Sequence, residues 1–189
     1  IGVDGKQLDP PIKTLFVYNS DLANCVPNSA GIREGLQRED LFISVHETFW
    51  TDTCMYADIV LPADTALERT DCHWAYGTWY LGIARQVIEP LGESINNTQL
   101  FRMLADKMGY VESSDNAFTQ TDEEIIKDIL LEAENEDGER FNCLAEGINF
   151  DDVVRNGWAR ASTDSKRRNW LENGWETPSK KIEIKCEAI

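Results

Sequence analysis

The segment "LFISVHETFWTDTCMYADIVLP", residues 41–62, decides the fold class because it holds two short apolar runs joined by a polar connection. The runs at 41–45 and 58–62 are rich in apolar and β-branched residues and lack strict polar alternation, which is typical of strands buried on both faces. The connection contains a short predicted helix that opens at Thr51 or Asp52. This segment therefore predicts a strand–helix–strand unit.

The residues upstream extend the same order. "KTLFVYN", 13–19, predicts another buried strand, and "AGIREGLQRED", 30–40, predicts a short amphipathic helix with Ile32 and Leu36 on one face. Strands and helices that alternate with connections of this length favour parallel pairing and right-handed crossovers. The predicted fold class is therefore α/β, an open, mainly parallel sheet with flanking helices in a Rossmann-like lobe.

The rest of the chain predicts a helical and irregular extension. An aromatic-rich stretch at 72–90 is expected to be extended, and apolar periodicity predicts helices at 96–110 and 121–134. A short helix is expected near 151–155, and an alternating strand closes the chain within 173–189. The sequence contains no internal repeat.

The net charge of −16 comes from 34 acidic against 18 basic residues, which disfavours binding to nucleic-acid phosphates. A solvated acidic surface explains this charge, and docking onto a basic partner is the alternative. The composition is typical of a soluble globular protein. It shows neither an apolar run long enough to span a membrane nor a signal peptide at its start, "IGVDGKQLDP".

The five cysteines are widely spaced and form no C-x-x-C pair, so they predict reduced thiols and no disulfide framework or metal cassette. Cys72 and His73 are adjacent, and adjacent residues of an extended chain point to opposite faces, which favours structural roles for both. We find no nucleophile–base pair and no poised carboxylate pair. The sequence therefore predicts neither a catalytic residue nor a metal site in this chain.

Polar residues follow each predicted parallel strand, where ligands bind in open α/β sheets. Glu47 can accept two hydrogen bonds from a ribose diol or from the N1–H and 2-amino groups of guanine; alternatively, it caps the next helix. The run Asn19 to Asp21 can donate to a phosphate or ribose, or it forms an ordinary turn. Glu68 and Arg69 either orient a ligand or form a surface ion pair. No glycine-rich phosphate loop accompanies them.

"REDLFISVHETFWTDTCMYADIVLPADTALERTD", 38–71, contains a predicted strand, an acidic residue and a second apolar run. In this order it resembles the strand, acidic residue and "T-x-T-A-x-x-A-D-I-V-L-P-A" run of the molybdopterin oxidoreductases, the dimethyl sulfoxide reductase superfamily. "IEPLGESINNTQLFRMLADKMG", 88–109, is similar to its "P-x-G-E-A-x-x-D" stretch and following helix, and "NGWETPSKKIEI", 173–184, to its "F-x-T-P-S-G-K-I-E-L". Three motifs in one order make the resemblance specific.

The resemblance implies that the chain is part of a several-fold longer molybdenum enzyme and is inactive alone. It implies a bis(molybdopterin guanine dinucleotide) cofactor for oxygen-atom or two-electron transfer, whose guanosine end this lobe holds. An iron–sulfur cluster, the molybdenum ligand and a barrel-like domain are expected elsewhere in the polypeptide. The expected parts are a linker at 1–11, a cofactor-binding lobe at 12–110, an extension at 111–172 and a strand at 173–189 that leads to a further domain.

Site residues carry over from the family's motifs to matching positions here. The implied cofactor-binding residues are Asn19, Ser20, Asp21, His46, Glu47, Thr51, Thr53, Arg69 and Asn97. The chain departs from the family where Asp21-Leu22 replaces Asn-Pro, Thr53-Cys54-Met55 replaces "TAR", and Ser179-Lys180-Lys181 replaces "SGK". The carboxylate of Asp21 would repel an anionic cofactor, which argues against direct contact.

The expected partners are a small-molecule substrate and an electron-transfer protein. The expected location is the bacterial cytoplasm or the periplasm, and the sequence does not distinguish these two compartments. A rival hypothesis is a free-standing acidic α/β interaction module without catalysis. In that case the aromatic residues between Trp74 and Tyr80 form a docking surface. The length of the open reading frame distinguishes the two hypotheses.

Overall fold

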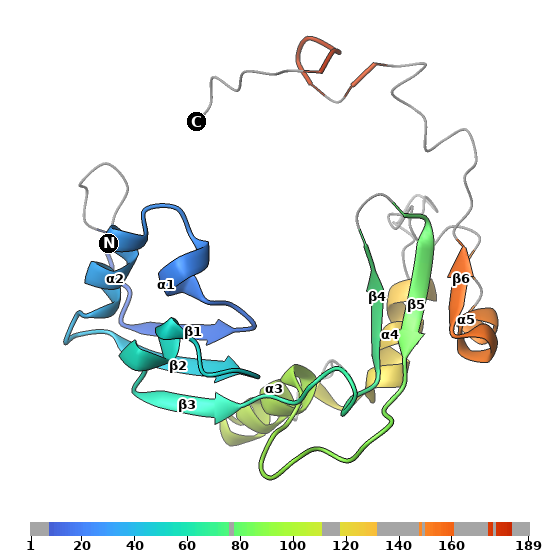
Figure 1. The fold of residues 1–189 in the computed structure, drawn as a ribbon, viewed down its shortest axis with the longest axis horizontal. Helices are drawn as coiled ribbons and strands as arrows, with labels where there is room; N and C mark the ends of the chain where they lie inside the picture. Colours follow the sequence, from blue (N-terminus) through green and yellow to red (C-terminus); the bar gives the residue numbers. More distant parts are fainter. Residues whose placement is uncertain are drawn as a thin grey trace. The chain divides into compact units, whose positions relative to one another are not determined.

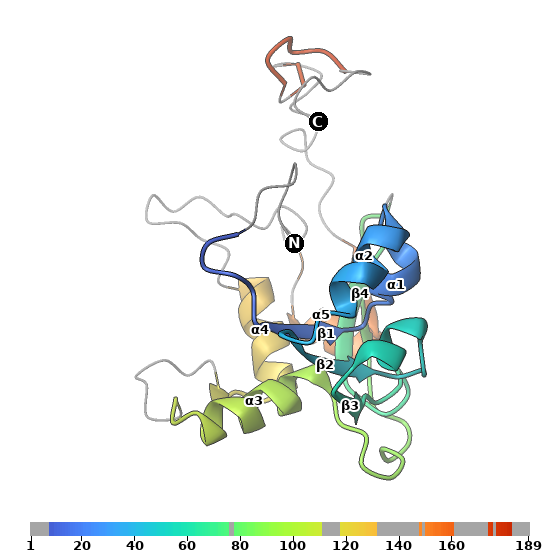
Figure 2. The ribbon, with the colours of Figure 1, turned by 90° about the vertical axis from the view of Figure 1, so that its left-hand side faces the viewer.

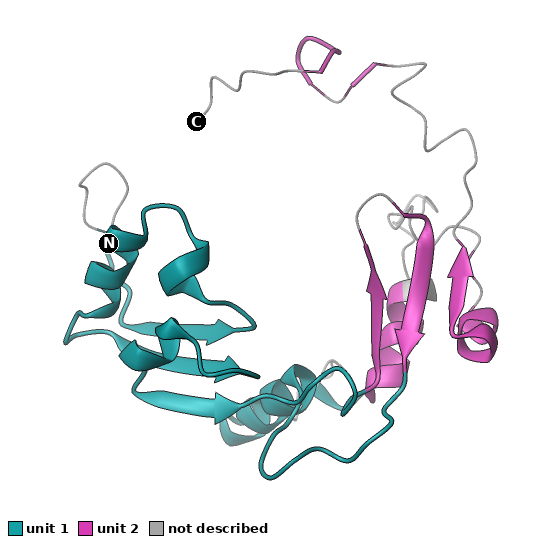
Figure 3. Ribbon diagram, viewed as in Figure 1, with its two compact units in different colours: residues 1–69, 85–120 teal, residues 70–84, 121–189 magenta. Residues whose placement is uncertain are grey.

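Two three-stranded sheets organise the chain in a computed structural model (Figure 1). The structure describes residues 8–75, 78–110, 118–131, 148, 150–160, 174–175 and 177–182. Contacts group the chain into unit 1, residues 1–69 and 85–120, and unit 2, residues 70–84 and 121–189 (Figure 3). The four parts expected from the sequence stay a prediction, because grouping by contacts does not establish independently folding domains. Among the described residues, no helix is long and apolar enough to cross a membrane.

The sheet of unit 1 is parallel, as predicted. It contains β1 (Thr14–Tyr18), β2 (Phe42–Glu47) and β3 (Ile59–Pro62) in the order β1-β2-β3. Val45 in β2 lies opposite Val17 of β1 and Val60 of β3. The α/β fold class is confirmed, and all three strands end at the same edge of the sheet.

One face of this sheet carries the core of unit 1. It packs against α1 (Leu22–Cys25), α2 (Ser29–Leu36) and a 3-10 helix, η1 (Asp52–Tyr56). The buried cluster consists of Val17, Ala23, Leu36, Ile43, Val45 and Cys54. The sequence predicts α2 and η1, but it predicts no helix where α1 forms. Burial of these apolar side chains is the main stabilising contribution to unit 1.

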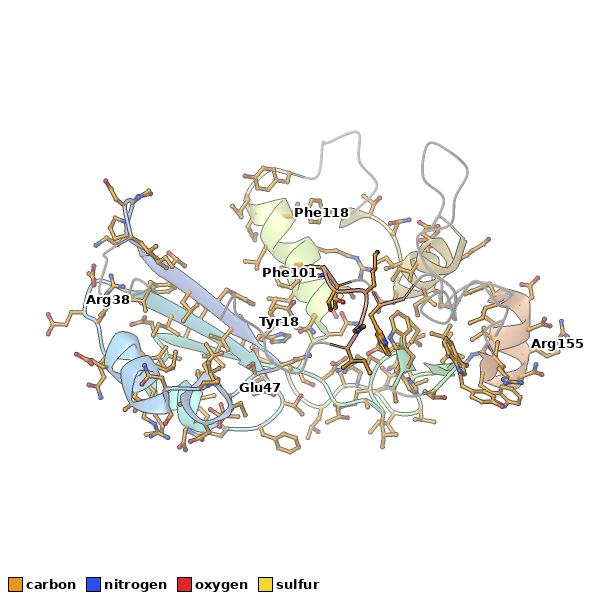
Figure 4. The ribbon with its side chains drawn as sticks, turned by 90° about the horizontal axis from the view of Figure 1, so that it is seen from above. Tyr18, Arg38, Glu47, Phe101, Phe118 and Arg155 are labelled. Atoms are coloured by element: carbon orange, nitrogen blue, oxygen red, sulfur yellow. The ribbon has the colours of Figure 1, made fainter. Side chains whose placement is uncertain are left out.

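The other face of the sheet meets α3 (Asn97–Lys107), which lies on the opposite side of the strands from α1 and α2 (Figures 2 and 4). The ring centroid of Phe101 in α3 lies 5.5 Å from that of Phe16 and 5.8 Å from that of Tyr18. Gly109 follows α3 with a φ of 77°, a left-handed conformation that ends a helix at little cost for glycine. The helix predicted at 96–110 is confirmed.

Unit 2 holds an antiparallel sheet that the sequence does not predict. It contains β4 (Asp71–Trp74), β5 (Tyr80–Ala84) and β6 (Trp158–Arg160), with β5 in the middle. The stretch predicted to be extended at 72–90 supplies only β4 and β5; β6 comes from much later in the chain.

The helices of unit 2 complete its core. They are α4 (Asp122–Leu131) and α5 (Phe150–Asn156), both predicted. The core cluster consists of Leu81, Ile83, Ile126, Ile148 and Val153. Thr121 and Glu124 form a capping box at the start of α4, since the Thr121 N–H donates to Glu124 Oε2 at 2.7 Å and the Glu124 N–H donates to Thr121 Oγ1 at 3.3 Å. Most of the strand predicted at the end of the chain, 183–189, lies outside the described residues.

Candidate functional site

The carboxyl ends of β1, β2 and β3 form a continuous polar edge. The N–H of Asn19 donates to the carbonyl of His46 at 3.2 Å, and the N–H of Ala63 donates to the carbonyl of Glu47 at 3.1 Å. Asn19 has a φ of 50°, a left-handed conformation that asparagine tolerates better than most residues. Figure 4 shows Glu47 at this edge and Arg38 at the opposite end of the sheet. The three strand exits therefore lie side by side.

Glu47 presents a carboxylate at this edge. Its Oε1 accepts a hydrogen bond from the N–H of Thr48 at 2.8 Å, and its side chain is half-buried. Within the described part of the chain, Oε2 has no hydrogen-bond partner. Nor does Glu47 cap η1, because the N–H of Thr53 donates to Asp21 instead. One carboxylate oxygen is thus left for a ligand.

Asn19 and Ser20 extend the polar surface beside Glu47. Over the described ranges, neither side chain makes a hydrogen bond. Thr51 precedes η1, and its hydroxyl lies 3.5 Å from Cys54 Sγ. These three side chains offer one amide and two hydroxyl groups, which can both donate and accept.

Asp21 and Thr53 are joined to each other. Asp21 Oδ1 accepts from the Thr53 hydroxyl at 2.7 Å and from its N–H at 3.3 Å, while Oδ2 accepts from Asn24 at 2.7 Å. Thr53 is fully buried, and its hydroxyl oxygen also accepts from the Ala23 N–H at 3.1 Å. The hydrogen bond from the Thr53 hydroxyl is the main cause that lowers the pKa of Asp21, followed by that from Asn24. Both residues fix the loop after β1 onto η1.

His46 and Asn97 also meet. His46 is fully buried; its Nδ1 lies 3.0 Å from Asn97 Oδ1 and its Nε2 lies 3.1 Å from the carbonyl oxygen of Ile95. Asn97 is the first residue of α3. The start of α3 therefore lies at the carboxyl end of β2.

Arg69 pairs with a carboxylate that the sequence does not single out. Its Nη1 donates to Asp64 Oδ1 at 2.8 Å and to the Asp64 carbonyl at 3.1 Å. The Asp64 side chain is only 3% exposed, and the Asp64 carbonyl also accepts from the Thr48 hydroxyl at 3.2 Å. Arg69 therefore stabilises the loop after β3 through Asp64, and the Thr48 hydroxyl joins that loop to the loop after β2.

Glu68 does not form the ion pair that its neighbour suggests. Its Oε2 accepts from the Thr65 N–H at 2.6 Å and its Oε1 accepts from the Leu91 N–H at 2.8 Å. The hydrogen bond from the Thr65 N–H is the main cause that lowers the pKa of this buried carboxyl. Glu68 thus stabilises the backbone at Thr65 and at Leu91. The T-x-x-E spacing of Thr65 and Glu68 is the sequence signal that could have identified it.

The described residues at this edge provide no metal centre. Among the described residues, no group of three His, Cys, Asp or Glu side chains could hold a metal ion. Cys72 and His73 pair with Ile83 and Gly82 in adjacent positions of β4 and therefore point to opposite faces, as predicted. Burial is the main cause that raises the pKa of the Cys72 thiol.

Residues 5–107 match the family model described as molybdopterin oxidoreductase. The chain belongs to the molybdopterin oxidoreductase family. The resemblance to the dimethyl sulfoxide reductase superfamily, drawn from three motifs, is confirmed. Membership implies a molybdenum–pterin cofactor for the protein.

Relatives of this molybdopterin oxidoreductase chain are several times longer than it is. It is 40% identical over 184 residues to "Probable oxidoreductase YoaE" of Bacillus subtilis. This match covers 97% of this chain and 25% of that protein. It is 30% identical over 136 residues to "Respiratory nitrate reductase subunit alpha" of Haloferax mediterranei, covering 71% of this chain and 13% of that protein. The chain thus spans about a quarter or less of these relatives.

A solved structure supports the fold. Acetylene hydratase from Pelobacter acetylenicus matches with a TM-score of 0.61 and 24% sequence identity, over 92% of this chain and 22% of that one. At this identity the likeness establishes the fold alone.

Proposed function

We propose that the carboxyl edge of β1, β2 and β3 binds the guanosine end of a molybdopterin guanine dinucleotide. The observation that carries this proposal is the Oε2 of Glu47 at the junction of the strand exits, which has no hydrogen-bond partner among the described residues. Family membership supplies the class of cofactor. The guanosine end of that cofactor offers hydrogen-bond donors that this edge can accept.

A carboxylate at this position accepts hydrogen bonds and donates none. Guanine offers two donors on one edge, N1–H and the 2-amino group, and ribose offers two hydroxyls, so either group can pair with Glu47. Asn19 and Ser20 lie next to it and have free side chains in the described structure, which suits the ribose or the phosphate. The hydroxyl of Thr51 is a further donor to phosphate.

The other expected site residues shape the edge. Asp21, His46, Thr53, Arg69 and Asn97 each have a hydrogen-bond partner inside unit 1. In the proposed site these side chains hold the loops that surround Glu47. Asp21 in particular accepts hydrogen bonds from Thr53 and Asn24, and these bonds hold its carboxylate against η1.

The donor set fits a nucleoside and does not fit a metal. Carboxylate, amide and hydroxyl groups gather at the edge, whereas the described residues hold no cluster of metal ligands. The cofactor would supply oxygen-atom or two-electron transfer when bound, and this lobe would bind and orient it. We accordingly propose an oxidoreductase in which the metal ligand, an iron–sulfur cluster, and the sites for substrate and electron partner belong to other parts of the polypeptide.

Cofactor content of the complete polypeptide tests this proposal. In Glu47→Ala we expect molybdenum and acid-released guanine nucleotide per chain to fall together, because the carboxylate that holds the guanosine is gone. The matched control is Glu39→Ala, an exposed glutamate just before β2 at the other end of the sheet. Unchanged molybdenum and guanine in Glu47→Ala would refute the site.

One observation favours the rival hypothesis of an acidic interaction module. Trp74, Trp79 and Tyr80 are 46%, 40% and 48% exposed. The proposal of a cofactor-binding lobe explains both Glu47 and the family match, and it is therefore preferred.

A further inference from the structure

His46 is a fully buried histidine whose ring does not reach the ligand in the proposed function. Both ring nitrogens have partners, Ile95 and Asn97, which come 49 and 51 residues later in the chain. A buried imidazole is costly without such partners. The ring therefore joins the end of β2 to the segment that leads into α3.

Ile95 determines which ring nitrogen carries a hydrogen. Its carbonyl oxygen can only accept, so Nε2 of His46 must donate. The same oxygen accepts from the N–H of Asp64 at 3.2 Å, and the N–H of Ile95 donates to the carbonyl of Pro62 at 3.2 Å. Ile95 is thus bound to the end of β3 as well as to β2.

Asn97 is suited to the remaining nitrogen, Nδ1. Its amide oxygen accepts from a protonated Nδ1, and after a half-turn of the amide its NH₂ group donates to an unprotonated one. An aspartate here would only accept. Since Asn97 begins α3 and Asn96 caps that helix by accepting from the Gln99 N–H at 2.7 Å, the contact lies at the first turn of α3.

The segment before α3 has a second anchor. Glu68 Oε1 accepts from the N–H of Leu91, and between the two anchors Gly92 adopts a φ of 64°, which glycine permits. Segment 91–97 is therefore held at both ends by buried polar side chains.

We propose that His46 and Asn97 are positioning residues of the nucleotide-binding edge and do not contact the ligand. The pair holds the start of α3 against the end of β2. Glu47 directly follows His46, and the carbonyl of His46 accepts from the N–H of Asn19, so a shift of His46 displaces both residues that face the ligand. The identity of the ligand rests on the proposed function. The contact between His46 and Asn97 is independent of that proposal.

Titration of the cofactor-free complete polypeptide with GMP tests the role. His46→Gln keeps a donor near Ile95 but loses the contact with Asn97, and Asn97→Leu removes the same contact from the other side. We expect each variant to bind GMP about three- to tenfold more weakly, and the double variant to be no weaker than the worse single variant, because both remove one interaction. Additive losses would overturn the pairing.

Two controls separate positioning from loss of stability. Gln99→Leu makes a comparable change on the exposed side of α3 and should leave GMP affinity unchanged. Asn96→Ala removes the helix cap and should lower thermal stability without a matching loss of affinity. If Asn96→Ala weakened GMP binding as much as Asn97→Leu, a purely structural role would replace the positioning role.

The ring itself supplies a spectroscopic readout. Selective ¹⁵N labelling of histidine should show a hydrogen on Nε2 of His46, and Asn97→Leu should change the Nδ1 signal and speed amide exchange at the start of α3. A hydrogen on Nδ1 with a bare Nε2 would overturn the assignment. The guanosine assignment would fail if wild-type protein bound no GMP or if Glu47→Gln bound GMP normally. In either case the histidine spectrum and the amide exchange would still show whether the contact between His46 and Asn97 holds α3 in place.

Discussion

Asp21 and Thr53 form the closest link between the loop after β1 and the helix before β3: the Thr53 hydroxyl donates to Asp21 Oδ1 at 2.7 Å. The same hydroxyl accepts from the N–H of Ala23. One fully buried hydroxyl oxygen thus bonds both to the loop after β1 and to α1. The rigidity of the proposed nucleotide edge depends on such side chains beneath it.

Thr53→Val tests this link, because valine keeps the volume and removes the hydroxyl. We expect the free energy of unfolding to fall by about 1–3 kcal/mol, since a buried donor and a carboxylate lose their partner. Urea denaturation measures the change. Thr14→Val, at the exposed start of β1, is the matched control and should change stability by less than about 0.5 kcal/mol. Equal effects would contradict a specific role for Thr53.

The lowered pKa of Asp21 predicts a pH dependence. Its pKa is below that of an unfolded aspartate, about 3.9, so the ionised form favours folding. This stabilisation is fully present above about pH 4 and is lost as the pH falls through the folded-state pKa. Wild-type protein should therefore lose more unfolding free energy than Asp21→Asn between about pH 5 and about pH 3. Parallel curves would show that Asp21 is not stabilised in this way.

Arg69 neutralises a buried carboxylate, so its removal should be costly. In Arg69→Met, Asp64 stays buried without its cation, and we expect a loss of about 3–5 kcal/mol in chemical denaturation. Adding Asp64→Asn to this variant should recover a large part of the loss, because the unpaired charge is then absent. A single variant within about 1 kcal/mol of wild type would show that the pair contributes little.

Phe101 is expected to attach α3 to the sheet. Phe101→Ala removes the ring contacts with Phe16 and Tyr18 and should cost about 1–3 kcal/mol, less than a core phenylalanine because the ring is 38% exposed. Met103→Ala, on the same helix at 52% exposure, is the control and should cost much less. Both losses are measured by urea denaturation, and equal losses would contradict the attachment.

Sequence patterns identified the elements whose signals are local. The apolar runs around Val45 and Val60 predict buried strands because they are short and bounded by polar turns, whereas a buried helix needs a longer apolar segment. In contrast, α1 has only four residues and too few for a periodic pattern, and β6 has three residues that are stabilised by pairing with β5 far along the chain. Such pairing depends on tertiary structure, which a local pattern does not encode.

The candidate site was predictable in position but not in its internal contacts. The end of a strand placed Glu47 at the sheet edge, and the structure agrees. The burial of Asp64 and the contact between Glu68 and Leu91 depend on the fold of distant loops. For the same reason, no pattern in the sequence shows that Ile95 and Asn97 enclose His46.

Titration of the cofactor-free polypeptide with GMP and AMP tests the central claim, that the Glu47 carboxylate holds guanosine, most directly. Glu47→Gln should weaken GMP binding about 10- to 100-fold, because hydrogen bonds to a charged acceptor are lost, while Glu39→Gln should bind like wild type. A loss confined to GMP would indicate that Glu47 contacts the base, and a loss for both nucleotides would indicate that it contacts the ribose. GMP affinity unchanged by Glu47→Gln would contradict the claim.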